Sequence, residues 1–216
     1  MKYPIYEHFY AWQGEGVHSG RSAYFIRTYG CPLKCPWCDS AGTWSKNYIP
    51  EFIEKLDSEE ILNLTKGKVF NFYVITGGEP TIFDWSEFTN KKDRPVHLET
   101  SGSFKIKGDF DWITVSPKRS KNPTKENIKR ANEIKLIVED EDSVRFWLNE
   151  FPEILEKETV WLNPEWSKRN DKDVLKKINE IVKNNLNFRA GYQLHKLFLV
   201  DQEDKNTKQE VPLGGK

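Results

Sequence analysis

The sequence predicts an α/β fold, an incomplete (β/α) barrel of about six parallel strands that forms one domain over residues 1–216. Short apolar segments typical of strands alternate with segments of helical periodicity, which indicates parallel strands joined by helical crossovers. A complete eight-stranded barrel usually takes ~250 residues. The chain, with 216 residues, is therefore expected to close only part of a barrel.

The expected strands are apolar mostly on both faces, as in parallel sheets that are covered on both sides. In chain order they are 23–28, 70–76, 96–100, 112–116, 133–138, 159–163 and 188–194. Helices are expected between them, where apolar residues recur at helical spacing. These segments are 58–65, 84–89, 124–131, 143–151 and 171–184.

Polar or glycine-rich clusters follow the ends of five expected strands. They read GCPLKCPWCDS, TGGEP, ETSGS, SPKRS and NPEWS. Because the carboxyl ends of parallel strands share one edge, loops from separate strands converge there and bind ligands. We therefore expect one ligand site at this edge.

The charge balance excludes some classes of partner. Lys and Arg number 33, as do Asp and Glu, so the formal net charge is zero. This is not the basic footprint of a protein that binds nucleic acid through its phosphates, and a small-molecule substrate fits better. No signal peptide and no apolar run of membrane-spanning length is present, which predicts a cytoplasmic protein without a membrane partner.

All three cysteines lie in the loop over residues 30–40, at Cys31, Cys35 and Cys38. No cysteine remains elsewhere for a disulfide framework, so the spacing indicates thiolates that bind metal. A C-x3-C-x2-C loop, restricted by Pro32 and Pro36, can give three ligands to a 4Fe-4S cluster. The fourth iron then stays open for the amino and carboxylate groups of S-adenosylmethionine.

The non-enzyme alternative is a zinc-stabilised binding module, in which a histidine such as His18 or His97 completes a structural zinc site. Structural zinc sites usually draw their ligands from two separated pairs, whereas these three thiolates crowd one loop. The colour of anaerobically purified protein separates the two, because an iron-sulfur cluster is brown and zinc is colourless.

Two of these motifs resemble the radical S-adenosylmethionine superfamily. CPLKCPWC is similar to its cysteine signature, and Thr76-Gly77-Gly78-Glu79-Pro80 resembles its GGE motif. The resemblance implies a radical S-adenosylmethionine core and reductive cleavage of that cofactor to a 5′-deoxyadenosyl radical. It also implies that the GGE segment binds the methionine ammonium of the cofactor.

Further segments resemble the 7-carboxy-7-deazaguanine synthase family. The segment 8–21 contains QGEG at residues 13–16, and the likeness continues in order through segments 39–40, 99–102, 115–118, 163–166 and 194–196. It implies a carbon-nitrogen lyase of queuosine biosynthesis. This lyase contracts the ring of 6-carboxy-5,6,7,8-tetrahydropterin to 7-carboxy-7-deazaguanine and releases ammonia. A carboxylate and an amide can read the guanidine-like edge of a pterin, and an arginine can clamp its carboxylate.

The resemblance implies two sets of site residues besides the cysteines. The expected substrate residues are Trp12, Gln13, Gly14, Glu15, Arg27, Thr76 and His195. The expected cofactor residues are Trp37, Cys38, Asp39, Gly78, Glu79, Ser101, Ser116, Pro117, Lys118, Asn163, Pro164, Glu165 and Trp166. Glu15 is expected to lie away from the cluster and GGE segments, because it precedes the first expected strand.

Two positions depart from the family pattern. Ser40 stands where the family has a threonine that binds Mg2+; its hydroxyl keeps the donor oxygen. Asn163 stands where the family often has glutamine, and it offers the same amide on a shorter arm. The resemblance thus implies Mg2+ as a third cofactor, with Ser40 as its protein ligand.

The resemblance also implies partners and rivals. It implies an electron donor such as flavodoxin, and leaves the oligomeric state open, with a homodimer among the alternatives. The tail 201–216 resembles family tails that return towards the active site. The rival enzyme is an activating enzyme for a glycyl-radical protein, which shares the cysteine spacing but not the QGEG segment.

Overall fold

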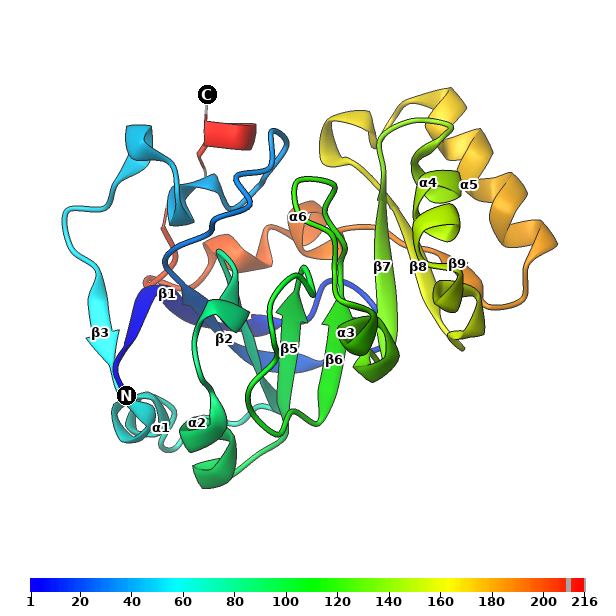
Figure 1. The fold of residues 1–216 in the computed structure, drawn as a ribbon. Coiled ribbons are helices and arrows are strands. Elements are labelled where there is room, and N and C mark those ends of the chain that lie inside the picture. Colours follow the sequence, from blue (N-terminus) through cyan, green and yellow to red (C-terminus); the bar gives the residue numbers. More distant parts are fainter. Residues whose placement is uncertain (209–210, 216) are drawn as a thin grey trace.

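The computed structural model describes residues 1–208 and 211–215, and its centre is a nine-stranded curved sheet. The strand order is β3-β1-β2-β4-β5-β6-β7-β8-β9, and the strands from β2 to β9 in that order are parallel (Figure 1). These parallel strands are β2 Ser22–Thr28, β4 Phe72–Gly77, β5 Val96–Thr100, β6 Trp112–Val115, β7 Glu133–Val138, β8 Val160–Pro164 and β9 Phe188–Ala190. The expected open α/β barrel is confirmed.

Two antiparallel strands extend the sheet where none was expected. Strand β1 (Tyr3–Trp12) pairs with β2, and the short β3 (Glu54–Leu56) pairs with β1. The segment 8–21 therefore begins within a strand. The charged and polar residues of β1 conceal its periodicity, and a bulge between Ile5 and Glu7 shifts its register.

The last expected strand is shorter than the sequence suggested. β9 ends at Ala190, and the segment that follows forms helix α6 (Leu194–Phe198). Gly191 separates them and packs against β8, where a Cβ would come 1.9 Å from Asn163 Oδ1. Close backbone approach at this glycine ends the strand.

The helices lie where the apolar spacing predicts them. They are α1 Ser58–Leu64, α2 Ser86–Lys91, α3 Lys125–Arg130, α4 Ser143–Glu150 and α5 Lys172–Asn184. Helix α1 begins at Ser58 because Asp57 forms a capping box with Glu60. Among the residues described, no helix is long and apolar enough to cross a membrane.

Alternation along the parallel strands separates a core face from an interior face. On β7, Ile134, Leu136 and Val138 belong to the main apolar core. Their neighbours Glu133 and Lys135 are also buried, on the opposite face of the sheet. The interior face thus carries polar side chains on β7, whereas Ala23, Phe72 and Val74 make it apolar on β2 and β4.

Glu133 anchors the turn that follows β1 inside the barrel. Its carboxylate, 2% exposed, accepts hydrogen bonds from the Val17 backbone N–H at 3.0 Å and from the indoles of Trp112 and Trp161 at 3.2 and 2.7 Å. Gly16 has φ +72°, and a Cβ there would come 2.4 Å from Glu133 Oε1. The interior of the sheet therefore fixes the position of residues 13–16.

Candidate active site

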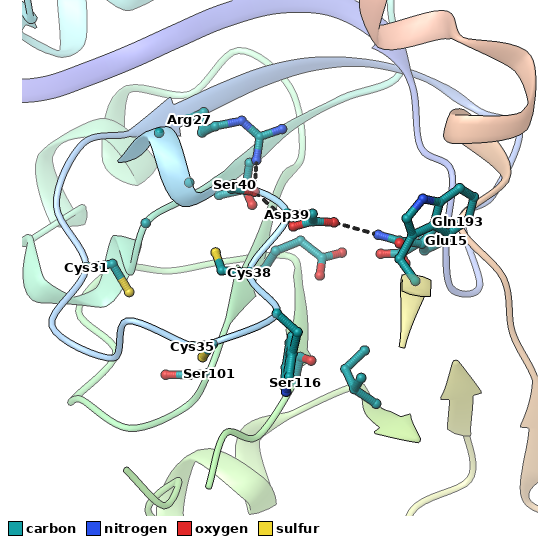
Figure 2. Close-up of a pocket in the computed structure, with 18 of the residues that line it drawn as sticks. Glu15, Arg27, Cys31, Cys35, Cys38, Asp39, Ser40, Ser101, Ser116 and Gln193 are labelled. Carbon is teal, nitrogen blue, oxygen red and sulfur yellow. Dashed lines mark hydrogen bonds between the residues drawn. The ribbon is translucent and has the colours of Figure 1, made fainter. Parts of the chain in front are cut away.

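A cavity of about 290 Å³ opens at the carboxyl ends of the parallel strands (Figure 2). All five polar clusters that follow strands contribute to its wall, which confirms that they share one edge. Representatives of the clusters are Cys31, Gly78, Ser101, Ser116 and Asn163. The sequence prediction of a single converging site is therefore correct at the level of these segments.

The cluster loop lies against the GGE segment. Glu79 N donates to Gly30 O at 2.9 Å, and Gly30 N donates to Thr43 O at 2.8 Å. A Cβ at Gly78 would come 2.1 Å from Gly30 O, so only glycine lets the two backbones meet this closely. The glycine of the motif has a packing function as well as its implied cofactor function.

The three cysteines are free thiols that line the cavity, and Figure 2 shows their sulfurs spread around one part of the loop. Burial raises the pKa of all three, that of Cys38 to about 11. Lys118 lowers the pKa of Cys35 in part, and a bound cluster would stabilise all three as thiolates. Three separated sulfurs on one concave loop fit the corners of a 4Fe-4S cluster.

Glu79 is 1% exposed, and the described residues that donate hydrogen bonds to its carboxylate are all neutral. Oε1 accepts from Thr100 Oγ1 and Thr81 Oγ1, both at 2.6 Å, and Oε2 accepts from Ser101 N and Oγ at 2.9 and 2.5 Å. These bonds fix the carboxylate without neutralising it. A negative carboxylate in a cavity wall fits a ligand ammonium.

A buried ion network lies on another part of the wall. Lys135 Nζ on β7 contacts Glu15 Oε2 at 2.5 Å and Glu99 Oε2 at 3.1 Å. Gln13 Nε2 donates to Glu99 Oε1 at 3.2 Å, and Asn163 Nδ2 donates to Glu15 Oε1 at 3.0 Å. The turn after β1 thus reaches across the barrel, where Glu15 contacts Asn163 on β8.

The network perturbs the protonation of its members. Burial alone would raise the pKa of Glu15, but the charge of Lys135 outweighs it and holds the pKa below its usual value. Burial raises the pKa of Glu99 despite Lys135, and the charge of Glu15 adds to this rise. Burial opposes the charge of Lys135, yet the two carboxylates raise its pKa. Lys135 is thus a cation at neutral pH.

Arg27 lies on β2 between the cavity and β1. Its Nε donates to Glu7 Oε1 at 2.7 Å, and its Nη1 donates to Ser40 Oγ at 3.1 Å. Glu7 thus orients the guanidinium towards the cluster loop, as Figure 2 shows for Arg27 and Ser40. Arg27 lines the cavity and can meet an anionic group there.

Asp39 joins the cluster loop to helix α6. Its Oδ2 accepts from Gln193 Nε2 at 2.9 Å and from Lys196 Nζ at 3.0 Å, while Ser40 Oγ donates to Oδ1 at 3.1 Å (Figure 2). Burial alone would raise the pKa of Asp39, but Lys196 and Gln193 lower it far below its usual value. Asp39 is therefore a carboxylate, and Ser40 beside it offers an oxygen to a hard cation.

The opposite wall carries most of the expected cofactor residues. Lys118 Nζ donates to Ser116 O at 2.8 Å and lies 5.4 Å from the centre of the Trp37 ring. Asn163 is 2% exposed, and its Oδ1 has no hydrogen-bond partner among the described residues. A buried amide oxygen without a donor fits the amino group of a bound adenine.

The C-terminal segment returns to the cluster loop, and Figure 1 shows that end of the chain beside it. Gly214 N donates to Cys38 O at 2.9 Å, while Ser45 Oγ and Asn47 Nδ2 donate to Gly215 O. Val211 contributes to the cavity wall. Residues 209, 210 and 216 of the expected tail lie outside the described residues.

The structure brings most of the expected site residues together. The cavity lining includes Gln13, Glu15, Arg27, Cys31, Cys35, Trp37, Cys38, Asp39, Ser40, Thr76, Gly78, Glu79, Ser101, Ser116, Lys118, Asn163, Pro164, Glu165, Trp166 and His195. Trp12, Gly14 and Pro117 are not part of this lining in the described structure. Trp12 packs on Phe198, and Gly14 lies under His195, which belongs to α6 rather than to a strand end.

Sequence reasoning missed several residues of the cavity wall. Glu99 and Lys135 sit inside strands, and Gln193 and Lys196 flank or lie in the unexpected helix α6. Glu99 and Lys196 lie in segments 99–102 and 194–196, which resemble the family, and the lysine within the apolar segment EIKLIV was a further signal, since a lysine is rarely buried unless it is paired.

Comparison with known proteins agrees with this geometry. Residues 12–92 match a family model described as a 4Fe-4S single cluster domain. A 7-carboxy-7-deazaguanine synthase from Flavobacterium psychrophilum is 33% identical over 89% of this chain and 90% of its own length. Another from a Synechocystis strain is 34% identical over 91% and 92%. The crystal structure of QueE from Escherichia coli superposes with a TM-score of 0.77, at 31% identity over 90% of this chain and 95% of that one.

The fold, the three-cysteine loop and the matching cluster domain define a radical S-adenosylmethionine enzyme that uses a 4Fe-4S cluster. The zinc-stabilised module is thereby set aside. Within that class, the relatives cover nearly the whole chain in sequence and in structure. The chain belongs to the 7-carboxy-7-deazaguanine synthase family.

Proposed function

We propose that this protein converts 6-carboxy-5,6,7,8-tetrahydropterin to 7-carboxy-7-deazaguanine with release of ammonia. The observation that carries the proposal is one cavity whose wall holds the three cysteines, the GGE strand end and the side chains of Gln13, Glu15 and Arg27. Cys31, Cys35 and Cys38 would hold the cluster, which together with S-adenosylmethionine would supply the radical chemistry that removes the hydrogen from C6 of the pterin. The chain itself binds, orients and shields the two reactants.

The proposed substrate half of the cavity is rich in fixed acceptors. Glu15 and Gln13 read the guanidine-like edge, and Arg27, held by Glu7, clamps the substrate carboxylate. Thr76 and His195 line the same cavity. Trp12 and Gly14 act indirectly in this proposal, since Trp12 supports α6 and Gly14 leaves room for His195.

The proposed cofactor half is formed by the cluster loop, the GGE strand end and the loops after β6 and β8. Glu79 offers a fixed carboxylate to the methionine ammonium. The residues proposed to line the cofactor are Trp37, Cys38, Asp39, Gly78, Ser101, Ser116, Lys118, Asn163, Pro164, Glu165 and Trp166. Pro117 supports the loop between Ser116 and Lys118.

We propose Mg2+ as a third component, held by Ser40 Oγ and by substrate oxygens. Asp39 beside Ser40 adds negative charge that favours a cation. Arg27 donates to the same hydroxyl at 3.1 Å and opposes one. Mg2+ keeps several waters and needs few protein ligands, so a single hydroxyl is sufficient. The metal would orient the substrate carboxylate and stabilise charge while the ring contracts.

Two partner proposals complete the function. A reduced flavodoxin-type protein supplies the electron to the cluster. A homodimer is proposed as the assembly, and Leu197, Phe198 and Leu199, which are 58%, 68% and 53% exposed, offer an apolar surface for it. Size-exclusion chromatography with light scattering tests the assembly, and reduction by purified flavodoxin tests the donor.

The decisive experiment is an anaerobic assay of reconstituted protein with the carboxylated tetrahydropterin, S-adenosylmethionine and a reductant. We expect the deazaguanine product and one ammonia for each pterin consumed. Cofactor cleavage that leaves the pterin intact would overturn the proposal and favour the activating-enzyme rival. A partly enclosed cavity of about 290 Å³ suits a small molecule better than a loop of a protein substrate.

A further inference from the structure

Lys135 is central to the wall of the cavity although no motif contains it. It projects from the interior face of β7, and the side chains of Lys135, Glu15 and Glu99 are 11%, 11% and 17% exposed. These three residues come from β7, the turn after β1 and β5, and all line the cavity. One ammonium therefore joins two carboxylates from separate segments.

The outer ends of this network are also fixed. Gln13 Nε2 donates to Glu99 Oε1, and the backbone N–H of Glu15 donates to Gln13 Oε1, both at 3.2 Å. Asn163 Nδ2 donates to Glu15 Oε1 at 3.0 Å. Each carboxylate is held between an amide and the ammonium. The remaining lone pairs of the carboxylate oxygens are the acceptors that the cavity presents.

Stability of the fold is a weak reason for this arrangement. Burying an ion pair costs desolvation, and apolar residues of similar size often replace such a pair without loss. The turn after β1 already has an anchor in Glu133, which holds Val17 N and excludes a Cβ at Gly16. A cation between two carboxylates that face a cavity instead indicates a part in ligand recognition.

We propose that Lys135 is a positioning residue for the substrate, which holds Glu15 and Glu99 together as one rigid pair of acceptors for the donor-rich edge of a ring. The inference rests on the proposed function and deepens it. Without the ammonium, two buried carboxylates would repel each other and turn apart. With it, one excess negative charge remains, and the paired acceptors select ligands with adjacent N–H groups. Lys135 acts through the two carboxylates and not on the reacting atoms.

The test compares Lys135→Met, which keeps length and removes the charge, with Lys135→Arg, which keeps the charge. In Lys135→Met we expect the KM for the carboxylated tetrahydropterin to rise about 30-fold at pH 8.5, with kcat changed less than about threefold. Iron content and S-adenosylmethionine affinity should stay within about twofold of the wild type. The KM of Lys135→Arg should be about tenfold lower than that of Lys135→Met, because arginine restores the cation.

A pH comparison supplies a readout that a purely structural lysine would not move. In Lys135→Met, a proton can take the place of the ammonium between Glu15 and Glu99 as pH falls. The KM ratio of variant to wild type should therefore be at least about threefold smaller at pH 6.5 than at pH 8.5. The other charged groups around the network are Glu133, His195, Asp39 and Lys118. Because the variant and the wild type share them, the KM ratio reports the protonation of Glu15 and Glu99.

Each outcome decides the inference. An unchanged KM in Lys135→Met, or parallel losses of iron, S-adenosylmethionine affinity and melting temperature without rescue by Lys135→Arg, would overturn it. If Lys135→Met does not fold, Lys135→Arg is the deciding variant. We expect its KM for the pterin to be higher than that of the wild type while its S-adenosylmethionine affinity is normal. A normal KM for the pterin with weakened S-adenosylmethionine binding would refute the positioning role. If the wild-type protein cleaves S-adenosylmethionine but never consumes the pterin, the proposed function itself is refuted. This result distinguishes failure of the proposed function from failure of the Lys135 inference.

Discussion

Replacing Glu15 by glutamine keeps the size of the side chain but changes its hydrogen-bonding pattern. The wild-type carboxylate accepts from Lys135 Nζ on one oxygen and from Asn163 Nδ2 on the other. In Glu15→Gln, one of these donors must face the new NH2 group, and the charge that a pterin edge would meet is lost. The substitution therefore converts two matched contacts into one match and one mismatch.

The magnitude follows from these contacts. A lost charge-assisted hydrogen bond costs about 1.5–3 kcal/mol, and a buried donor left without an acceptor costs about 1–3 kcal/mol. Partial relaxation of the network brings the expected loss of transition-state binding to about 2–4 kcal/mol. This corresponds to roughly a 30- to 1000-fold lower kcat/KM for the pterin. Because Asn163 lies in the proposed cofactor wall, S-adenosylmethionine affinity should also fall, by no more than about threefold.

The assay measures both quantities on the same anaerobic preparation. Pterin turnover gives kcat/KM, and equilibrium binding gives the affinity for S-adenosylmethionine. Glu180→Gln is the control, because Glu180 is exposed on α5 and away from the cavity. If Glu15→Gln handled the pterin normally while binding S-adenosylmethionine poorly, the turn after β1 would serve the cofactor and the substrate assignment would be refuted.

Three further substitutions test other parts of the site. Cys35→Ala should lose most of the bound iron and all turnover while its circular dichroism stays unchanged, because Cys35 lies on a loop beyond the strands; full activity would refute the cluster ligand. Ser40→Ala should need about tenfold more Mg2+ for half-maximal turnover than Ser40→Thr, which retains the hydroxyl, and identical Mg2+ titrations would exclude Ser40 as a ligand. Gly78→Ala should lower the free energy of unfolding by about 1–3 kcal/mol and reduce iron content, since its Cβ would overlap Gly30 O; an unchanged melting temperature would contradict the close packing.

Local spacing was sufficient for the cluster loop and for most strands. Cys31, Cys35 and Cys38 lie within eight residues, and that local spacing predicts a metal-binding loop. Buried parallel strands are rich in apolar residues, and the expected strands 96–100 and 133–138 match β5 and β7 residue for residue. The short β3 gave no such signal, because its pairing with β1 rather than its own composition makes it a strand, and a bulge interrupts the alternation of the aromatic-rich β1.

The sequence alone determined the class of chemistry, because the thiolate spacing, the GGE segment and the strand-end clusters are local features that can be recognised in the sequence. Only the tertiary structure decided which charged side chains meet in the cavity at the carboxyl edge of the sheet. Lys135 meets Glu15 across 120 residues and Glu99 across 36. Contacts at such separation depend on barrel curvature and on the turn that Glu133 anchors. An isolated lysine in an apolar strand has no partner in sequence, and the fold supplies two.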